Sequence, residues 1–225
     1  MSLVTVIVLL AINAAVAMSA IAFYLYIKAR RLARDADDIS GQDRNVYGQV
    51  VGTERPVIAL HTYKPPDGVI PRRGTLMALE AKILASIFDC PILLAVGKTV
   101  RHETRTESEI YRDHLRQFDP DLKFVFGEKD EVRDTKSETD EMFRLCQVHD
   151  FNHVLVLGAW PHLGSRIIDY WQAVNYDQKL RVEFIGVKIP FYFYWWESLM
   201  WLAEKIIPPG SRRRQLVLDI IGRRG

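Results

Sequence analysis

The chain has 225 residues, of which 48% are hydrophobic and 26% are charged, and its formal net charge is +2. This length is enough for one complete domain and a separate anchoring segment. The nearly balanced charge excludes the strongly basic surface that nucleic-acid-binding proteins need, so we expect no nucleic-acid partner. The two cysteines, Cys90 and Cys146, lie in apolar segments without metal-ligand spacing, which predicts buried thiols and no metal site.

Residues 1–34 predict a membrane anchor with a basic flank. No charged residue occurs from Leu3 to Ile27, and about 20 apolar residues suffice to span a bilayer. A cleaved signal peptide is the alternative, because Val16 to Ala20 resembles a small-residue cleavage site. The lack of a basic region before the apolar run favours an uncleaved helix. Four basic residues at positions 28–34 follow it, so the positive-inside rule predicts a single-pass protein of the lipid bilayer with a cytoplasmic main domain.

A polar linker at residues 35–54 leads to a predicted α/β domain at residues 55–190. Short apolar runs predict strands at residues 57–60, 92–96, 122–126, 154–157 and 181–187. Helical patterns between them predict helices at residues 75–88, 107–118, 135–148 and from 165 onward. This alternation predicts a Rossmann-like parallel sheet with helices on both faces, preceded by one N-terminal transmembrane helix.

Three local predictions concern the helices of this domain. Leucine and isoleucine recur at helical spacing at positions 76, 79, 83 and 87, which predicts the apolar face of the first helix. Thr135 or Ser137 is expected to cap the third helix. Residues 159–164 predict a loop after the fourth strand, and Ser165 predicts the cap of the helix that follows.

Residues 191–225 form an aromatic, Arg-rich C-terminal segment. Six aromatic residues follow one another from Phe191 to Trp196, and a predicted helix with three charged residues comes next. This segment is too short and too charged to span a bilayer. Aromatic side chains of this density suit the headgroup region of a membrane, where Arg212 and its neighbours can meet anionic lipid. The alternative is that the aromatic residues cover one face of the sheet or form a dimer surface.

Polar side chains follow several of the predicted strands and indicate one shared site. Each of His61, His102 and His162 comes just after a predicted strand, and the carboxyl ends of parallel strands meet at one edge of a sheet. Arginine residues fall in the same zone, at positions Arg72, Arg73, Arg101, Arg105 and Arg166. Guanidinium groups beside helix N-termini bind phosphate or carboxylate groups. We therefore predict a site for a small anionic ligand at this edge.

Two residues of the predicted site receive specific roles. His162 is the candidate acid or base, because an imidazole titrates near neutral pH, and Arg166 is the candidate anion clamp. Thr135 begins a helix whose backbone N–H groups can serve as donors. Glu107, Glu109 and Glu138 lie in the first turns of helices, where they either complement the helix dipole or orient a site residue.

The catalytic and cofactor motifs with strong signatures are missing from the sequence. It contains no glycine-rich dinucleotide fingerprint, no Walker loop and no G-x-S-x-G nucleophile elbow. The sequence consequently leaves the cofactor unknown, and it leaves open whether the protein is an enzyme.

In order along the chain, these residues resemble the DUF218 family, the group that includes YdcF, ElyC and SanA. The matching features are Arg73 at the first helix, Ser108-Glu109, Thr135 with Glu138, His162 with Arg166, and Trp196 with Glu204. A departure is the end of the first strand, where His61-Thr62-Tyr63-Lys64 replaces the family's glycine-rich loop. The resemblance implies a divergent member with a membrane anchor, a Rossmann-like domain and a role in the bacterial envelope or cell wall.

Two functions follow as hypotheses. The first is a membrane-anchored protein that binds a small anionic ligand, such as a nucleotide or a phosphorylated envelope precursor. The alternative is a non-enzymatic membrane protein that recruits or regulates envelope machinery, with a membrane protein or a second copy of the chain as its partner. Alanine at His162 and Arg166 should abolish the first function, whereas removal of residues 191–225 should abolish the second.

Overall fold

The computed structural model describes residues 13–31, 54–63, 65–95, 104–127, 132, 134–208, 211–213 and 216. Two predicted site residues, Arg101 and His102, lie outside the described residues. So do the first part of the predicted membrane span, at residues 3–12, and nearly all of the predicted linker.

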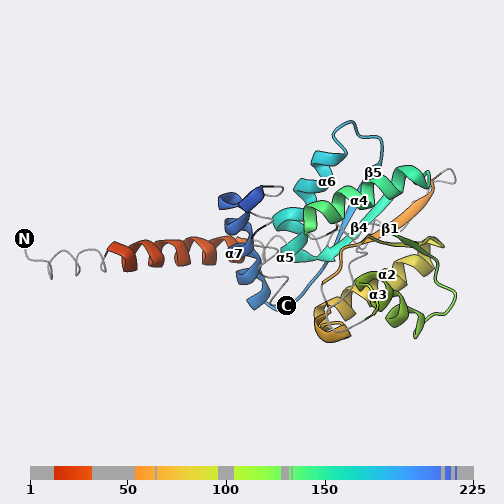
Figure 1. The fold of residues 1–225 in the computed structure, drawn as a ribbon, viewed down its shortest axis with the longest axis horizontal. Helices are drawn as coiled ribbons and strands as arrows, with labels where there is room; N and C mark the ends of the chain where they lie inside the picture. Colours follow the sequence, from red (N-terminus) through yellow and green to blue (C-terminus); the bar gives the residue numbers. More distant parts are fainter. Residues whose placement is uncertain are drawn as a thin grey trace, which may run out of the picture.

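A five-stranded parallel sheet forms the centre of the molecule (Figure 1). Its strands are β1 (Pro56–Leu60), β2 (Ile92–Leu94), β3 (Phe124–Phe126), β4 (His153–Ala159) and β5 (Arg181–Val187). The spatial order is β3-β2-β1-β4-β5, and every neighbouring pair is parallel. The chain therefore adds β2 and β3 on one side of β1, crosses over, and then adds β4 and β5 on the other side. Ligands of such sheets bind at this switch point, beyond the carboxyl ends of the strands.

Helices cover both faces of the sheet, as the alternating pattern predicts. The main ones are α2 (Arg72–Phe88), α3 (Glu107–Arg116), α4 (Thr135–Val148), α6 (Ile168–Val174) and α7 (Tyr192–Ile206). Shorter turns are η2 (Pro66–Gly68), α5 (Trp160–His162) and the π-helical turn η3 (Leu163–Ile167). In Figure 1, α2 and α3 pack together on one side of the sheet, and α4 and α6 pack together on the other.

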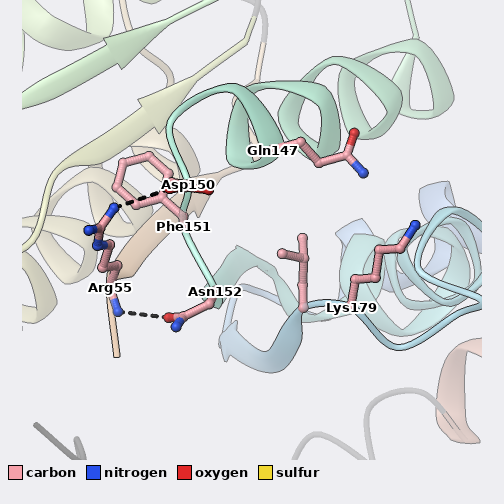
Figure 2. Close-up of a pocket in the computed structure, with 7 residues that line it drawn as sticks. Arg55, Gln147, Asp150, Phe151, Asn152 and Lys179 are labelled. Carbon is pink, nitrogen blue, oxygen red and sulfur yellow. Dashed lines mark hydrogen bonds and ion pairs between the residues drawn. The ribbon is translucent and has the colours of Figure 1, made fainter. Parts of the chain in front are cut away.

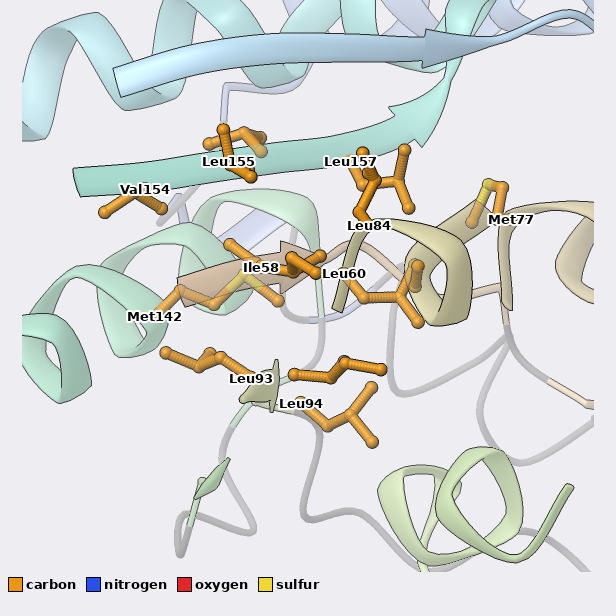
Figure 3. Packing of buried hydrophobic residues seen from close by; sticks show 14 of the residues in the cluster. Ile58, Leu60, Met77, Leu84, Leu93, Leu94, Met142, Val154, Leu155 and Leu157 are labelled. Atoms are coloured by element: carbon orange, nitrogen blue, oxygen red, sulfur yellow. The ribbon is translucent and has the colours of Figure 1, made fainter. Parts of the chain in front are cut away.

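The core lies along the three central strands, where apolar residues follow one another without alternation (Figure 3). Strands β1, β2 and β4 are buried on both faces, which explains why they contain runs such as Val154 to Leu157. Met142 of α4 packs into this cluster from one face, and Leu84 of α2 from the other. Cys90 and Cys146 are buried free thiols, and burial raises the pKa of each to about 12. The prediction of buried, reduced cysteines is confirmed.

The predicted apolar face of α2 is wrong. Met77, Ala78, Ala81, Leu84 and Ala85 are the residues of α2 that face the sheet. The larger side chains at positions 76, 83 and 87 are exposed instead. Three alanines on the inner face let the helix axis approach the sheet closely, at the packing density typical of protein interiors. Periodicity alone does not separate these two faces, because both recur at helical spacing.

A helix at residues 13–31 projects away from the domain, and α7 crosses its base (Figure 1). Leu25 and Ala29 are buried at this junction, and Tyr24 lies with its ring centroid 6.4 Å from that of Trp201 in α7. Within the part of the chain that the structure describes, no helix is both long enough and apolar enough to cross a membrane.

Candidate functional site

The switch point between β1 and β4 brings together six of the predicted site residues. His61 directly follows β1, and its backbone N–H donates to the carbonyl of Leu157 in β4 at 2.9 Å. His162 and Arg166 follow β4, and α4 begins beside them. The residues that meet here are His61, Arg73, Thr135, Glu138, His162 and Arg166. The expectation that the ends of parallel strands gather these residues at one edge is therefore met for all six.

Arg105 and Glu109 have contacts outside this cluster. Arg105 lies 3.5 Å from Asp113 in a partly exposed ion pair. Glu109 completes a capping box with Thr106: its carboxylate accepts from the Thr106 backbone N–H at 2.7 Å, and its own N–H donates to the Thr106 hydroxyl. The backbone donor lowers the pKa of Glu109. Of the two roles proposed for Glu109, the structure supports helix capping.

The chain after β4 turns into a helix at once. Trp160 begins α5, and Pro161 fits the first turn because that position needs no backbone donor. The prediction of a loop at residues 159–164 with Ser165 as the cap is wrong. The π-helical turn η3 follows without a break, and such turns widen a helix locally and recur at functional sites. This turn places His162 at its start and Arg166 within it, both buried.

The hydrogen bonds of His61 fix its tautomer. The indole Nε1–H of Trp171 donates to His61 Nε2 at 3.0 Å, and indole nitrogen is a donor only. Nε2 must therefore be the acceptor, so the proton of the neutral ring is on Nδ1. That Nδ1–H donates to the Glu138 carboxylate at 2.9 Å. All three side chains are buried, so His61 links α6 to α4 through these two hydrogen bonds.

Two buried glutamates converge on Thr62. The Thr62 hydroxyl donates to Glu107 Oε1 at 2.5 Å, and the Thr62 backbone N–H donates to Glu138 Oε1 at 3.2 Å. Glu107 begins α3 and Glu138 lies in the first turn of α4, so two helix starts are tied to the loop after β1. Each carboxylate is satisfied by donors that the fold fixes in position, as a buried charge requires. Glu107, which the sequence places at a helix start with either a capping or an orienting role, belongs to this cluster.

His162 contacts Thr135 through one ring nitrogen. Nε2 lies 2.9 Å from the Thr135 hydroxyl, and the ring packs against Tyr63 with centroids 5.6 Å apart. Thr135 is available for this contact because Asp134, and not Thr135 or Ser137, is the N-cap of α4. Burial lowers the pKa of His162 well below its ordinary value, and the nearby Arg166 adds to the effect. The ring is therefore neutral at physiological pH, which suits a hydrogen-bond partner or a base and disfavours a proton donor.

The lowered pKa of His162 predicts how stability depends on pH. In the unfolded chain His162 takes up a proton near its ordinary pKa of about 6.5, whereas the folded chain leaves it neutral. Acidification below that value therefore favours unfolding, by up to about 1.4 kcal/mol for each pH unit. We expect His162→Gln to remove this part of the acid sensitivity in urea titrations between neutral and mildly acidic pH. The same substitution at exposed His149 is the control, and parallel curves for wild type and His162→Gln would contradict the assignment.

Arg166 is bound by two glutamates of α7. Its Nη1 donates to Glu204 at 2.6 Å and its Nη2 to Glu197 at 2.8 Å, and all three side chains are buried. The Tyr170 hydroxyl donates to the second oxygen of Glu204 at 2.8 Å. Burial raises the pKa of Glu197, and Arg166 opposes that change. Each terminal nitrogen of the proposed anion clamp thus already donates one hydrogen bond to a carboxylate, and Nε is the buried nitrogen of this guanidinium that has no hydrogen-bond partner.

Arg73 is held between two aromatic rings. Its guanidinium carbon lies 4.1 Å from the ring centroid of Tyr63 and 4.6 Å from that of Phe193. The Tyr111 hydroxyl fixes the Tyr63 backbone, since it accepts from the N–H and donates to the carbonyl, each at 3.0 Å. Cation–π contacts with these two rings position the guanidinium without consuming its N–H donors. Tyr63 therefore touches both Arg73 and His162 and joins them into one site.

Sequence reasoning missed the residues that support this site. Tyr63 and Trp171 carry no local chemical signature, although Tyr63 lies in the loop after β1 and Trp171 follows Tyr170 in a predicted helix. Glu197 directly follows the run of aromatic residues, and no local pattern indicates its pairing with Arg166. The one available signal was the pair of acidic residues, Glu197 and Glu204, in an otherwise apolar helix, because buried charges of this kind require a cationic partner.

A cavity of about 490 Å³ lies at the opposite edge of the sheet, where the strands begin (Figure 2). Arg55 and Asn152, which precede β1 and β4, line it and are joined by a 2.7 Å hydrogen bond. Lys179 and Gln147 add polar side chains from the adjoining segments. None of the predicted site residues lines this cavity, and its charged groups Arg55 and Asp150 form an exposed ion pair at 3.5 Å.

No protein-family model matches this chain, and comparisons with curated proteins and with solved structures also find no match. The resemblance to the DUF218 family therefore stays a prediction. Among the described residues, no group of three or more His, Cys, Asp or Glu side chains is arranged to hold a metal ion.

Proposed function

We propose that this protein binds a small anionic ligand at the switch point between β1 and β4. One observation supports this most strongly. Within the part of the chain that the structure describes, Arg73 Nε, His162 Nδ1 and Arg166 Nε are buried without a hydrogen-bond partner. Buried polar atoms are normally paired, and three such nitrogens in one cluster indicate that a ligand supplies the missing acceptors. Phosphate and carboxylate oxygens are the acceptors that guanidinium groups prefer.

The three nitrogens contribute differently to the proposed site. Arg166 orients one N–H toward the ligand, but its charge is offset by Glu197 and Glu204. Arg73 is the cation that attracts the anion. His162 donates from Nδ1 when the Thr135 hydroxyl donates to Nε2. A neutral imidazole at this position donates a hydrogen bond without adding charge, so the site favours a ligand of low net negative charge, such as a phosphate ester or a carboxylate.

We further propose that residues 1–34 anchor this domain in a membrane, with the domain in the cytoplasm. The uncharged stretch from Leu3 to Ile27, and the exposed apolar side chains of the helix at residues 13–31, support the anchor. The strand order supports a Rossmann-like domain, and the order of the site motifs supports a divergent DUF218-type protein with a role in the bacterial envelope. Retention of the full chain in membranes washed with alkaline carbonate tests the anchor.

Thermal unfolding of the full chain in detergent tests the proposed site. We expect inorganic phosphate, nucleoside monophosphates or sugar phosphates to raise the melting temperature, because a ligand at a hundredfold over its dissociation constant adds about 2.7 kcal/mol. Arg73→Met should abolish this shift. Arg72→Met is the matched control, because Arg72 is the preceding residue of the same helix and is exposed. Shifts of equal size in both variants would mean that these anions do not bind at Arg73.

The recruiting function stays a second candidate because of the outer face of α2. Leu76, Ile83 and Ile87 form an exposed apolar stripe that nothing in the described part of the chain covers, and such stripes are typical of interaction surfaces. Serine at Ile83 and Ile87 should release a protein partner and preserve anion binding if recruitment is the function. Arg73→Met should have the opposite effects if ligand binding is the function.

A further inference from the structure

We propose that α7 lies along the surface of the bilayer and turns its outer face toward the lipid. The outer face consists of Trp195, Leu199 and Ile206, and exposed Phe191 immediately precedes the helix; we call these four residues the α7 stripe. The three helical residues recur at intervals of four and seven and therefore lie on one side of the helix. Between 36% and 69% of each side chain is exposed. A continuous row of large apolar side chains on a soluble surface indicates a contact partner.

The inner face of α7 is fixed to the domain, so the stripe is a rigid surface. Glu197 and Glu204 bind Arg166, and both are buried. Ser198, also buried, donates to the carbonyl of Tyr194 one turn earlier at 2.8 Å. The helix can therefore not rotate to bury the stripe without breaking two buried ion pairs. Exposure of the stripe is a property of the folded domain.

The position of the helix at residues 13–31 identifies the bilayer as the partner. This helix packs on α7 at Trp201, where Lys28 Nζ lies 3.5 Å from the ring centroid and Tyr24 contacts the ring. Figure 1 shows the helix projecting from the domain while α7 runs across its base. If the projecting helix enters a membrane, as the proposed function requires, α7 must lie along the membrane surface. The inference rests on that part of the proposed function.

Charge and composition favour lipid over a second copy of the chain. Aromatic side chains such as Trp195 and Phe191 prefer the headgroup region of a bilayer, where one side of the ring contacts acyl chains and the other contacts water. Lys205 lies in the last turn of α7, and Arg212 and Arg213 follow it; all three are exposed. Basic residues beside an apolar stripe attract anionic lipid headgroups. The stripe of α2 has neither aromatic residues nor a neighbouring apolar helix, so we assign it no lipid contact.

Tryptophan quenching in vesicles tests this orientation. The full chain is reconstituted into phosphatidylcholine vesicles with phosphatidylglycerol, and bromine on the upper acyl chain serves as the quencher. We expect the bromolipid to quench Trp195, so that Trp195→Phe lowers the quenched intensity by roughly half. Trp160→Phe is the control, because Trp160 is buried against Gly186 of β5 and should contribute no quenched intensity.

A second pair of variants keeps the test independent of tryptophan replacement. Leu199→Asp should lower the quenching of Trp195 about twofold, because a carboxylate resists insertion beside anionic headgroups. Ile83→Asp, on the outer face of α2, should leave the quenching of Trp195 unchanged. Quenching that is equal in wild type and Trp195→Phe, with the chain retained after alkaline washing, would overturn this inference and leave the anchor standing. Release of the chain by alkaline washing would overturn both the orientation of α7 and the proposed membrane anchor.

Discussion

Replacing Arg166 with methionine is expected to lower the free energy of unfolding by about 3–5 kcal/mol. The substitution leaves Glu197 and Glu204 buried without the guanidinium that pairs with them. Two carboxylates of like charge then remain in an apolar environment, and burying charges that have no cationic partner lowers the free energy of unfolding. Urea unfolding of the full chain in detergent, followed by tryptophan fluorescence, measures the change.

The pH dependence of this variant provides an internal check. Without Arg166, burial should raise the pKa of Glu197 further than it already does in the native protein. A carboxyl group whose pKa is raised on folding is better tolerated when it is protonated, so the loss of stability should be smaller at acidic pH than above neutral pH. Adding Glu197→Gln and Glu204→Gln to Arg166→Met should recover at least half of the loss, because no buried charge then stays unpaired.

Lys136→Met is the control for Arg166. Lys136 pairs with Asp140 at 2.6 Å, and both side chains of this pair are partly exposed. Partly solvated pairs contribute little, so we expect a change below about 1 kcal/mol. Equal losses in the two variants would mean that the network between η3 and α7 has no special energetic role.

Replacing Glu138 with glutamine is expected to destabilise the fold by about 1–3 kcal/mol, although the side chain keeps its shape. The groups bonded to Glu138 are all donors: the Nδ1–H of His61, the backbone N–H of Thr62 and, more weakly, the Thr62 hydroxyl. A glutamine offers one acceptor oxygen and one donor NH2, so one donor must face another. His61 cannot relieve this by moving its proton to Nε2, because Trp171 donates there. Thermal and urea unfolding measure the loss.

A double-mutant cycle separates this explanation from a simple loss of charge. In Trp171→Phe, His61 is free to carry its proton on Nε2, and Nδ1 can then accept from the glutamine at position 138. The combined change should therefore cost less than the sum of the two single changes, by about 1 kcal/mol or more. Strict additivity would contradict the assigned tautomer of His61.

The sequence predicted the sheet because its three central strands are buried on both faces. Uninterrupted apolar runs such as Val154 to Leu157 have few alternatives to a central parallel strand. The placement of His61 and His162 at one edge followed from that topology alone, because residues after neighbouring parallel strands must meet. The sequence also indicated that these two histidines can form hydrogen bonds, and the topology indicated that they do so at the carboxyl edge of the sheet.

The remaining features depend on contacts that no local pattern records. Arg166 is 31 and 38 residues from its two glutamates, so its pairing could not be read from spacing. The inner face of α2 uses alanines, which give a weaker periodic signal than the exposed leucine and isoleucines. Trp160 and Pro161 were predicted as loop residues, but proline is tolerated in the first turn of a helix.

The most direct test of the proposed anion site is nitrogen NMR of His162. Full-length chain with labelled histidine is titrated in detergent with inorganic phosphate, and His162→Gln identifies the resonance. We predict a saturable shift of the His162 Nδ1 signal that is lost in Arg73→Met and kept in Arg72→Met. An unchanged His162 signal in folded protein at saturating phosphate, or the same shift in both arginine variants, would contradict anion binding between Arg73 and His162.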